Sequence, residues 1–155
     1  MVNKNITAKN GRLAIDHLLR PLVFTNGVFD ILHVGHVTYL SQAKSRGASL
    51  IVALNSDASV KRLNKGSDRP INKIEDRVAV IAALGCVDAV ISFDEDTPLE
   101  LILTIKPDIL IKGGDWPQDK IVGSSEIKAW GGVTHSIPFE HDTSTTRTIE
   151  RIRRG

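Results

Sequence analysis

Cysteine is nearly absent from this sequence, and so is any long apolar run. Cys86 is the single cysteine, so no disulfide can form within the chain, and its place in an apolar stretch is typical of core packing. A chain without disulfides suits a reducing compartment, and we expect a cytoplasmic protein. The first residues contain no apolar signal core, and no later apolar run reaches membrane-spanning length. We therefore expect no membrane partner.

The chain also has little excess charge. Lys and Arg number 20 against 18 Asp and Glu, which gives a net charge of +2. That excess is too small to favour nucleic acid as the main partner, whereas a small anionic substrate fits it. With 41% hydrophobic and 25% charged residues among 155, the composition and length are those of one globular domain.

Several familiar catalytic motifs are missing as well. The segment TNGVFD after the first apolar run has one glycine, which argues against the G-x-G-x-x-G of dinucleotide-dependent dehydrogenases. The sequence has no G-x-x-x-x-G-K-[ST] phosphate loop, so a Walker-type kinase is unsupported. It also has no nucleophile elbow of a serine hydrolase.

The most informative stretch that is present is LVFTNGVFDILHVGH, residues 22–36. Its pattern predicts a buried strand, a turn, and a helix whose first turn carries His33 and His36. Two imidazoles at this spacing lie on one face, beside the unpaired N–H groups and the positive end of the helix dipole. Gly35 between them lets a ligand approach the backbone. The stretch predicts an anion site, with phosphate as the expected anion.

The two histidines admit two other interpretations. Two surface histidines near a helix cap are the ordinary alternative, and for a single histidine that alternative is the commoner one. A zinc site needs further Cys, Asp or Glu ligands close by, which the motif lacks, so we expect no metal site made by the protein alone.

Strand-like and helix-like patterns alternate along the chain without an internal repeat. Strands are predicted at 22–24, 49–54, 88–93, 108–112 and 133–137. Helices are predicted at 12–20, 33–46, 58–63, 74–84, 98–105, 124–130 and from 143 onward. The alternation predicts the α/β class: a Rossmann-like, doubly wound domain with a five-stranded parallel sheet. We expect residues 1–20 to form a tail and short helix, and residues 21–155 to form this single domain.

In such a sheet ligands bind outside the carboxyl ends of the strands. Four unusual stretches fall on that edge, at 25–36, 55–57, 112–116 and the approach to Thr143, and we expect them to form one site. The cationic loop from Lys61 to Pro70 is either a solvated turn or an anion-binding flap.

Some single residues admit more than one role. A carboxylate such as Asp30 beside phosphates would repel them unless it contacts Mg²⁺, a cation or sugar hydroxyls, and we favour substrate or Mg²⁺ contact over helix capping. Asp57 fits helix capping and a ligand role equally. Trp116 would stack on a nucleobase or shield the sheet edge. For Arg77 we favour a structural role, through an acidic neighbour on its own helix or a neighbouring subunit.

The sequence also resembles a known family. The stretch TNGVFDILHVGHVTYLSQAKSRG, with LNSD, EDRV, IKGGDW and STT, closely resembles the nucleotidyltransferase superfamily marked by H-x-G-H and a late serine/threonine motif. The match covers nearly everything from Phe24 to the C-terminus. Within the superfamily, NSDASVKRLNKGSDRPIN and FDEDTPLELILTIKPDILIKGGDW look most like the adenylyltransferases of bacterial ADP-heptose synthesis, in their stand-alone form.

The resemblance implies a function. AMP would pass from ATP to D-glycero-β-D-manno-heptose 1-phosphate, giving pyrophosphate and ADP-heptose for lipopolysaccharide or related surface sugars. Mg²⁺ would accompany ATP, and a homodimer is implied. Because a phosphomonoester has its second pKa at about 6, the attacking phosphate needs no general base. Catalysis then rests on placing two anions in line and neutralising their charge.

The resemblance also implies roles for individual residues. His33 and His36 would face the ATP phosphates, and Lys61 or Lys65 would supply a mobile cation. Nucleotide contacts are expected at Thr25, Asn26, Gly27, Phe29, Gly113, Asp115, Trp116, Thr143, Ser144, Thr145 and Thr146. Contacts to the sugar phosphate are expected at Asp30, Asn55, Asp57 and Arg69.

Two alternatives stay open. One is a glycerol-3-phosphate-type cytidylyltransferase; such enzymes often carry an arginine shortly before the serine/threonine motif, where this chain has Pro138 to Asp142. The other is a catalytically silent nucleotide-binding module.

Overall fold

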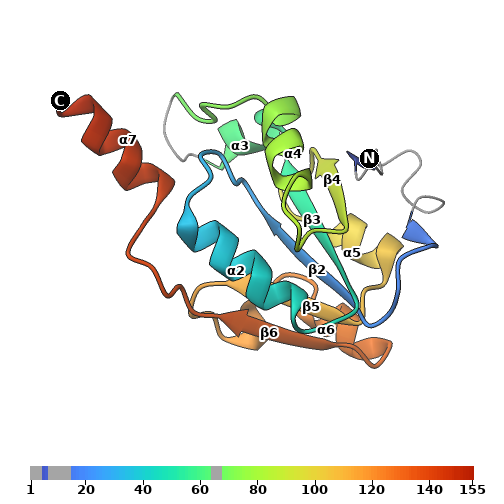
Figure 1. Ribbon diagram of the computed structural model, residues 1–155. Coiled ribbons are helices and arrows are strands. Elements are labelled where there is room, and N and C mark those ends of the chain that lie inside the picture. The colour runs from blue at the N-terminus through green and yellow to red at the C-terminus, as the bar shows by residue number, and fades with distance from the viewer. Residues whose placement is uncertain (1–4, 7–14, 64–67) are drawn as a thin grey trace.

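A parallel β-sheet forms the centre of the protein (Figure 1). The structure is a computed structural model that describes residues 5–6, 15–63 and 68–155. The sheet has six strands in the order β1-β4-β3-β2-β5-β6, and every pair of neighbours is parallel. The strands are β1 (Asn5–Ile6), β2 (Leu22–Gly27), β3 (Ser49–Asn55), β4 (Ala89–Phe93), β5 (Ile109–Gly113) and β6 (Val133–Ile137).

Helices cover both faces of this sheet. They are α2 (Val34–Lys44), α3 (Asp57–Arg62), α4 (Ile74–Ala82), α5 (Leu99–Ile105), η1 (Gln118–Lys120), α6 (Ser124–Ala129) and α7 (Thr145–Arg153). Leu22 and Phe24 of β2 pack into a core with α5 and α6, whereas Val23 between them packs into a second core with α2 and α4. Successive residues of a strand point to opposite faces, so a strand apolar throughout requires cover on both sides.

The predicted fold class is confirmed: the five expected strands form a parallel sheet in an α/β fold. The two-residue strand β1 adds an edge that was not expected, with Asn5 in register with Val90 of β4. A pair of residues is too short to show an alternating pattern. Of the predicted helix at 12–20, residues 12–14 lie outside the described residues, and the chain from Asp16 to Arg20 forms turns and bends.

The order of the strands decides where a ligand can bind. From β2 the chain builds the sheet in one direction through β3 and β4, and then returns to place β5 on the other side of β2. Ligands of open α/β sheets bind at the carboxyl ends of the strands where the order reverses in this way. The ends of β2 and β5 therefore mark the expected site.

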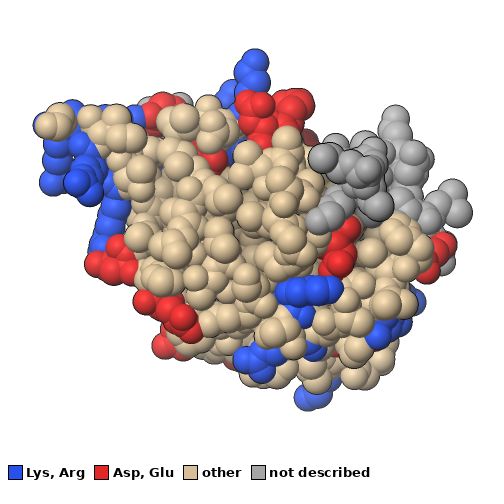
Figure 2. All heavy atoms as spheres, viewed as in Figure 1, with Lys and Arg blue, Asp and Glu red and all other residues tan. Residues whose placement is uncertain are grey.

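The outer surface is unevenly charged. In the view of Figure 2 the broad face over α2 and α4 carries few charged side chains, while Lys and Arg gather at the end of the molecule where α7 lies. Among the described residues, no helix is both long and apolar enough to cross a membrane.

Candidate functional site

Two adjoining cavities open at the carboxyl ends of β2 and β5. The first has a volume of about 460 Å³ and the second about 310 Å³. The first lies between the loop after β2, the start of α2 and the segment that leads into α7. The second lies toward the ends of β3 and β4. Both share a wall made of Asn26, Gly27, Val28, Lys112 and Trp116.

His33 and His36 line the first cavity side by side. His33 is the N-cap residue of α2 and His36 lies in its first turn. Their rings stack with centroids 3.8 Å apart, and the ring of Phe29 meets His36 edge-on at 5.0 Å. Desolvation by burial, and next the charge of His33, lower the pKa of His36 to about 4. Burial, and next the charge of His141, lower the pKa of His33 as well. Both rings are therefore neutral near pH 7 until an anion favours their protonation.

The backbone before these histidines is strained. Phe29 has φ +47°, in the left-handed region that bulky residues rarely adopt. A Cβ on Gly27 would lie 2.8 Å from the Phe29 ring, so only glycine lets the ring fold back over this turn. Strain of this kind gathers at functional sites, where the surrounding structure holds it in place. Here it sets the ring of Phe29 against that of His36.

The segment that starts α7 lies across the cavity from the two histidines and contacts one of them. Thr143 Oγ1 lies 3.2 Å from His33 Nδ1, although the two residues are 110 positions apart. A Cβ on Gly35 would lie 3.1 Å from both the His33 ring and Thr143 Oγ1, so the absent side chain makes this approach possible. Ser144 caps α7 by accepting a hydrogen bond from Arg147 N, as its sequence predicts. Two helix N-termini thus line one cavity, and both favour an anion.

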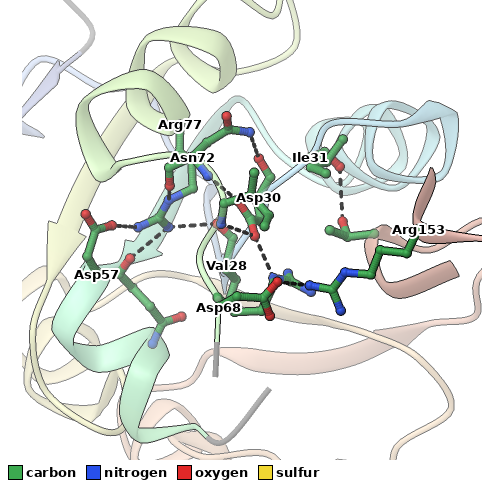
Figure 3. Close-up of polar contacts among 12 residues, drawn as sticks. Val28, Asp30, Ile31, Asp57, Asp68, Asn72, Arg77 and Arg153 are labelled. Carbon is green, nitrogen blue, oxygen red and sulfur yellow. Dashed lines mark hydrogen bonds and ion pairs between the residues drawn. The ribbon is translucent and has the colours of Figure 1, made fainter. Parts of the chain in front are cut away.

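Asp30 and Arg69 form a buried ion pair at the edge of the first cavity (Figure 3). Asp30 Oδ2 accepts hydrogen bonds from Arg69 Nε at 2.6 Å and from Ile71 N at 2.9 Å, while Oδ1 accepts one from Asn72 N at 2.8 Å. The carboxylate anchors the loop before α4 and neutralises Arg69. Its predicted contact with substrate or Mg²⁺ stays a prediction.

Arg77 is a buried positioning residue whose partners the sequence did not reveal. Its guanidinium donates to the carbonyls of Val28, Asn55 and Asn72 and pairs with Asp57 (Figure 3). The structural role is confirmed, but the partner is Asp57 instead of an acidic neighbour on its own helix. The cap of α3 is the Ser56 hydroxyl, which accepts from Ser59 N.

Thr25 is part of the buried core beneath the site. It is fully buried, and its hydroxyl lies 2.6 Å from Tyr39 Oη, whose O–H also reaches the Ile111 carbonyl. Burial raises the pKa of Tyr39, so the phenol stays protonated. The pair holds α2 against β2 and β5.

Most of the predicted site residues meet in the two cavities. The first contains Asn26, Gly27, Phe29, Asp30, His33, His36, Arg69, Gly113, Trp116, Thr143, Ser144, Thr145 and Thr146, and the second contains Asn55. Among the predicted residues that the structure describes, Thr25, Asp57, Lys61 and Asp115 line neither cavity. Lys61 is exposed on α3, and Lys65 lies outside the described residues.

Two exposed aromatic rings border Gly113 and Gly114 at the end of β5. A Cβ on Gly113 would lie 2.8 Å from the Phe139 ring, and one on Gly114 would lie 2.8 Å from Trp116 Nε1. Phe139 is 63% exposed and Trp116 51% exposed, and Trp116 Nε1 donates to Gly113 O. The rings and the bare backbone between them offer a surface for a nucleobase. Phe139 was not among the predicted residues, because a single aromatic in a loop carries no pattern.

The second cavity offers groups suited to a hydroxylated, phosphorylated molecule. Beyond the shared wall its polar lining residues are Asn55, Asp96, Thr97 and Lys120. Its apolar lining residues there are Leu63, Pro98, Ile121 and Val122. Arg62 donates to Asp96 at 2.7 Å at the rim. Amide, hydroxyl and carboxylate groups bind sugar hydroxyls, and lysine binds phosphate.

Comparison with known proteins places this geometry in a family. A model of cytidylyltransferase-like proteins matches residues 24–151. A protein of Bordetella bronchiseptica named D-beta-D-heptose 1-phosphate adenylyltransferase is 58% identical over 92% of this chain and 88% of its own length. The bifunctional protein HldE of Pseudomonas putida is 55% identical over 86% of this chain, which spans 28% of that longer protein.

Solved structures agree with the fold. A crystal structure titled lipopolysaccharide core biosynthesis protein, from Thermoplasma volcanium, has a TM-score of 0.63 and 33% identity, over 79% of this chain and 98% of its own. A pantoate-beta-alanine ligase from Francisella tularensis has a TM-score of 0.64 at 16% identity, over 94% of this chain and 72% of its own, which is a likeness of fold alone.

Proposed function

Because this chain belongs to the cytidylyltransferase-like family, we propose that it transfers AMP from ATP to D-glycero-β-D-manno-heptose 1-phosphate. The products would be ADP-heptose, for lipopolysaccharide or related surface sugars, and pyrophosphate. The observation that carries the proposal is the contact of His33 with Thr143, since it joins the H-x-G-H helix and the serine/threonine helix into one phosphate cradle. The near full-length relative from Bordetella bronchiseptica supplies the choice of substrates.

The two cavities suit the two substrates. ATP would occupy the first, with its base near Phe139 and Trp116 and its phosphates at the two helix N-termini. The sugar 1-phosphate would occupy the second, where Asn55, Thr97 and Lys120 are available. The part of the shared wall made by Asn26, Gly27 and Val28 would then face the α-phosphorus, and the acceptor would approach from the side opposite the leaving pyrophosphate.

The chemistry needs no covalent intermediate. An oxygen of the acceptor phosphate, already ionised at neutral pH, forms a bond to the α-phosphorus as the bond to the bridging oxygen breaks. His33, His36 and the N–H groups at the start of α7 donate hydrogen bonds to the outer phosphates, whose charge grows in this step. The preorganised donors lower the barrier because they require no rearrangement as the charge develops.

Mg²⁺ would enter with ATP. Among the described residues no group of three or more His, Cys, Asp or Glu side chains could hold a metal ion. A magnesium ion held mainly by nucleotide phosphates keeps several waters and needs no protein cage, and the hydroxyls of Thr143 and Thr146 fit such a hydrated ion. When bound it would neutralise charge on the outer phosphates.

Residues 21–155 would act as one catalytic domain after a tail at 1–20, in the cytoplasm, with no nucleic-acid or membrane partner. A homodimer would use the face over α2 and α4, where charges are few and Val34, Val37 and Val80 are exposed (Figure 2).

The test is a substrate panel. Purified protein with ATP, Mg²⁺ and the heptose 1-phosphate should release pyrophosphate, and His33→Ala should lower kcat by ~10²–10³, as for loss of one preorganised donor. If pyrophosphate is released with CTP and glycerol 3-phosphate instead, the protein is a cytidylyltransferase. Nucleotide binding without pyrophosphate release from any pair would identify a silent binding module.

A further inference from the structure

His141 is a third imidazole of the first cavity, in the segment between β6 and α7. Its Nε2 lies 3.0 Å from Thr38 Oγ1 on α2, in a half-buried contact between residues 103 positions apart. It lines the same cavity as His33 and His36. Burial, and next the charge of His141, lower the pKa of His33.

The segment that carries His141 is fastened at several points. Gln42 on α2 donates to the Glu140 carboxylate, and Arg147 on α7 pairs with Asp142. These contacts engage both acidic neighbours of His141 with partners of their own. The segment is therefore tied to α2 through Glu140 and to α7 through Asp142, and the imidazole itself contacts α2 through Thr38.

The contact with Thr38 also bears on the ring proton. When the Thr38 hydroxyl donates to Nε2, the proton of the neutral ring lies on Nδ1. Nδ1 then has an N–H to offer to an anion in the cavity.

The position of the shared wall indicates which part of the nucleotide would lie beside His141. Transfer requires the α-phosphorus at that wall, because the acceptor cavity adjoins the nucleotide cavity there. In-line displacement then directs the leaving pyrophosphate away from the second cavity, toward His33 and Thr143. His141 lines the first cavity and not the second.

We propose that His141, positioned by Thr38, is a further binding contact for the outer phosphates of the nucleoside triphosphate, the part that leaves as pyrophosphate. This inference rests on the proposed function for the identity of the ligand, but not on the sugar or on the base. The contact strengthens binding of triphosphate and pyrophosphate and leaves the monophosphate unaffected. It adds a third imidazole to the H-x-G-H pair.

The test is calorimetric binding of pyrophosphate alone and of AMP alone to His141→Gln. The Kd for pyrophosphate should rise about 10- to 150-fold, the range for loss of a hydrogen bond to a charged group, while the Kd for AMP changes by less than about 2-fold. Thr38→Val, which keeps the imidazole but removes its anchor, should weaken pyrophosphate binding by a smaller factor. His17→Gln is the matched control, since His17 is exposed and precedes the amino end of β2.

Two results would overturn the inference. One is an unchanged Kd for pyrophosphate in His141→Gln. The other is an equal loss of pyrophosphate and AMP binding, which would mean that the whole segment had shifted. If instead the enzyme adenylates another sugar phosphate or uses CTP, the proposed function fails while the difference between pyrophosphate and AMP remains, so the two failures are distinguishable.

Discussion

Arg77 Nη2 lies 2.6 Å from Asp57 Oδ1 beneath the floor of the site. Arg77 is 1% exposed, and its other N–H groups serve the carbonyls of Val28, Asn55 and Asn72. One guanidinium thus ties the loop after β2, the end of β3 and the loop before α4 to one another. The shape of both cavities depends on this tie, because Val28 and Asn55 belong to their walls.

Arg77→Met should therefore destabilise the protein strongly. Three buried carbonyls would lose a donor and Asp57 would lose its partner, for which we expect a loss of about 3 kcal/mol in the free energy of unfolding. Urea denaturation measures this free energy. Arg62→Met is the matched control: its ion pairs with Asp94 and Asp96 are exposed, and we expect little change in the free energy of unfolding. Equal losses in the free energy of unfolding of the two variants would contradict this role of Arg77.

Asp30 and Arg69 should be coupled in stability. Their side chains are 0% and 7% exposed, and removing either partner leaves the other as a buried, unpaired charge. In a double-mutant cycle with Asp30→Asn and Arg69→Gln, the coupling energy should be ~1–3 kcal/mol. A coupling near zero would contradict a stabilising ion pair between Asp30 and Arg69.

The stability of the protein should fall as the pH drops below the ordinary histidine range. The pKa of His36 is about 4 in the folded protein and about 6.5 in an unfolded chain. Between these values the unfolded state binds more protons, so acid favours unfolding. His36→Gln should show a shallower fall in Tm than wild type between about pH 6.5 and pH 4, and His17→Gln should show the same fall as wild type. Parallel curves for His36→Gln and wild type would refute the assignment.

Nucleotide binding should take up protons. Burial keeps His33 and His36 neutral in the free protein, and a triphosphate beside them favours the protonated rings. His141, Arg69 and Asp30 also face this cavity. The affinity for ATP should rise as the pH falls from about 8 to about 6, since histidines titrate in this range. Calorimetry in two buffers of different ionisation enthalpy measures the uptake, which the double variant His33→Ala/His36→Gln should lose.

The fluorescence of Trp116 should change when a nucleobase binds. The protein has two tryptophans, and Trp130 is a structural one whose Nε1 donates to Pro107 O. In Trp130→Phe, binding of AMP should change the fluorescence of Trp116, because a stacked base covers its exposed ring. Trp116→Phe serves as the reference, since only Trp130 then emits. No response in Trp130→Phe would favour the role of shielding the sheet edge.

The sequence by itself determined the elements and the kind of site. Apolar runs such as residues 50–54 of the strand Ser49–Asn55 predict strands covered on both faces, because burial acts on every side chain of such a run. The histidines fall at a helix start, and Ser144 caps a helix, because capping and helix propensity act over a few neighbouring residues. The motifs were also sufficient to predict the family.

Only the tertiary structure decided which of these elements meet. The partner of Arg77 is 20 positions away and that of His33 is 110 positions away, and both pairings depend on the order of strands in the sheet. Asp30 pairs with Arg69 for the same reason. Local preferences fix the course of the backbone over a turn or a strand, whereas ion pairs and cavity walls form between segments that packing of the two cores brings together. The third imidazole, His141, became visible only when that packing placed its ring beside Thr38 and the cavity.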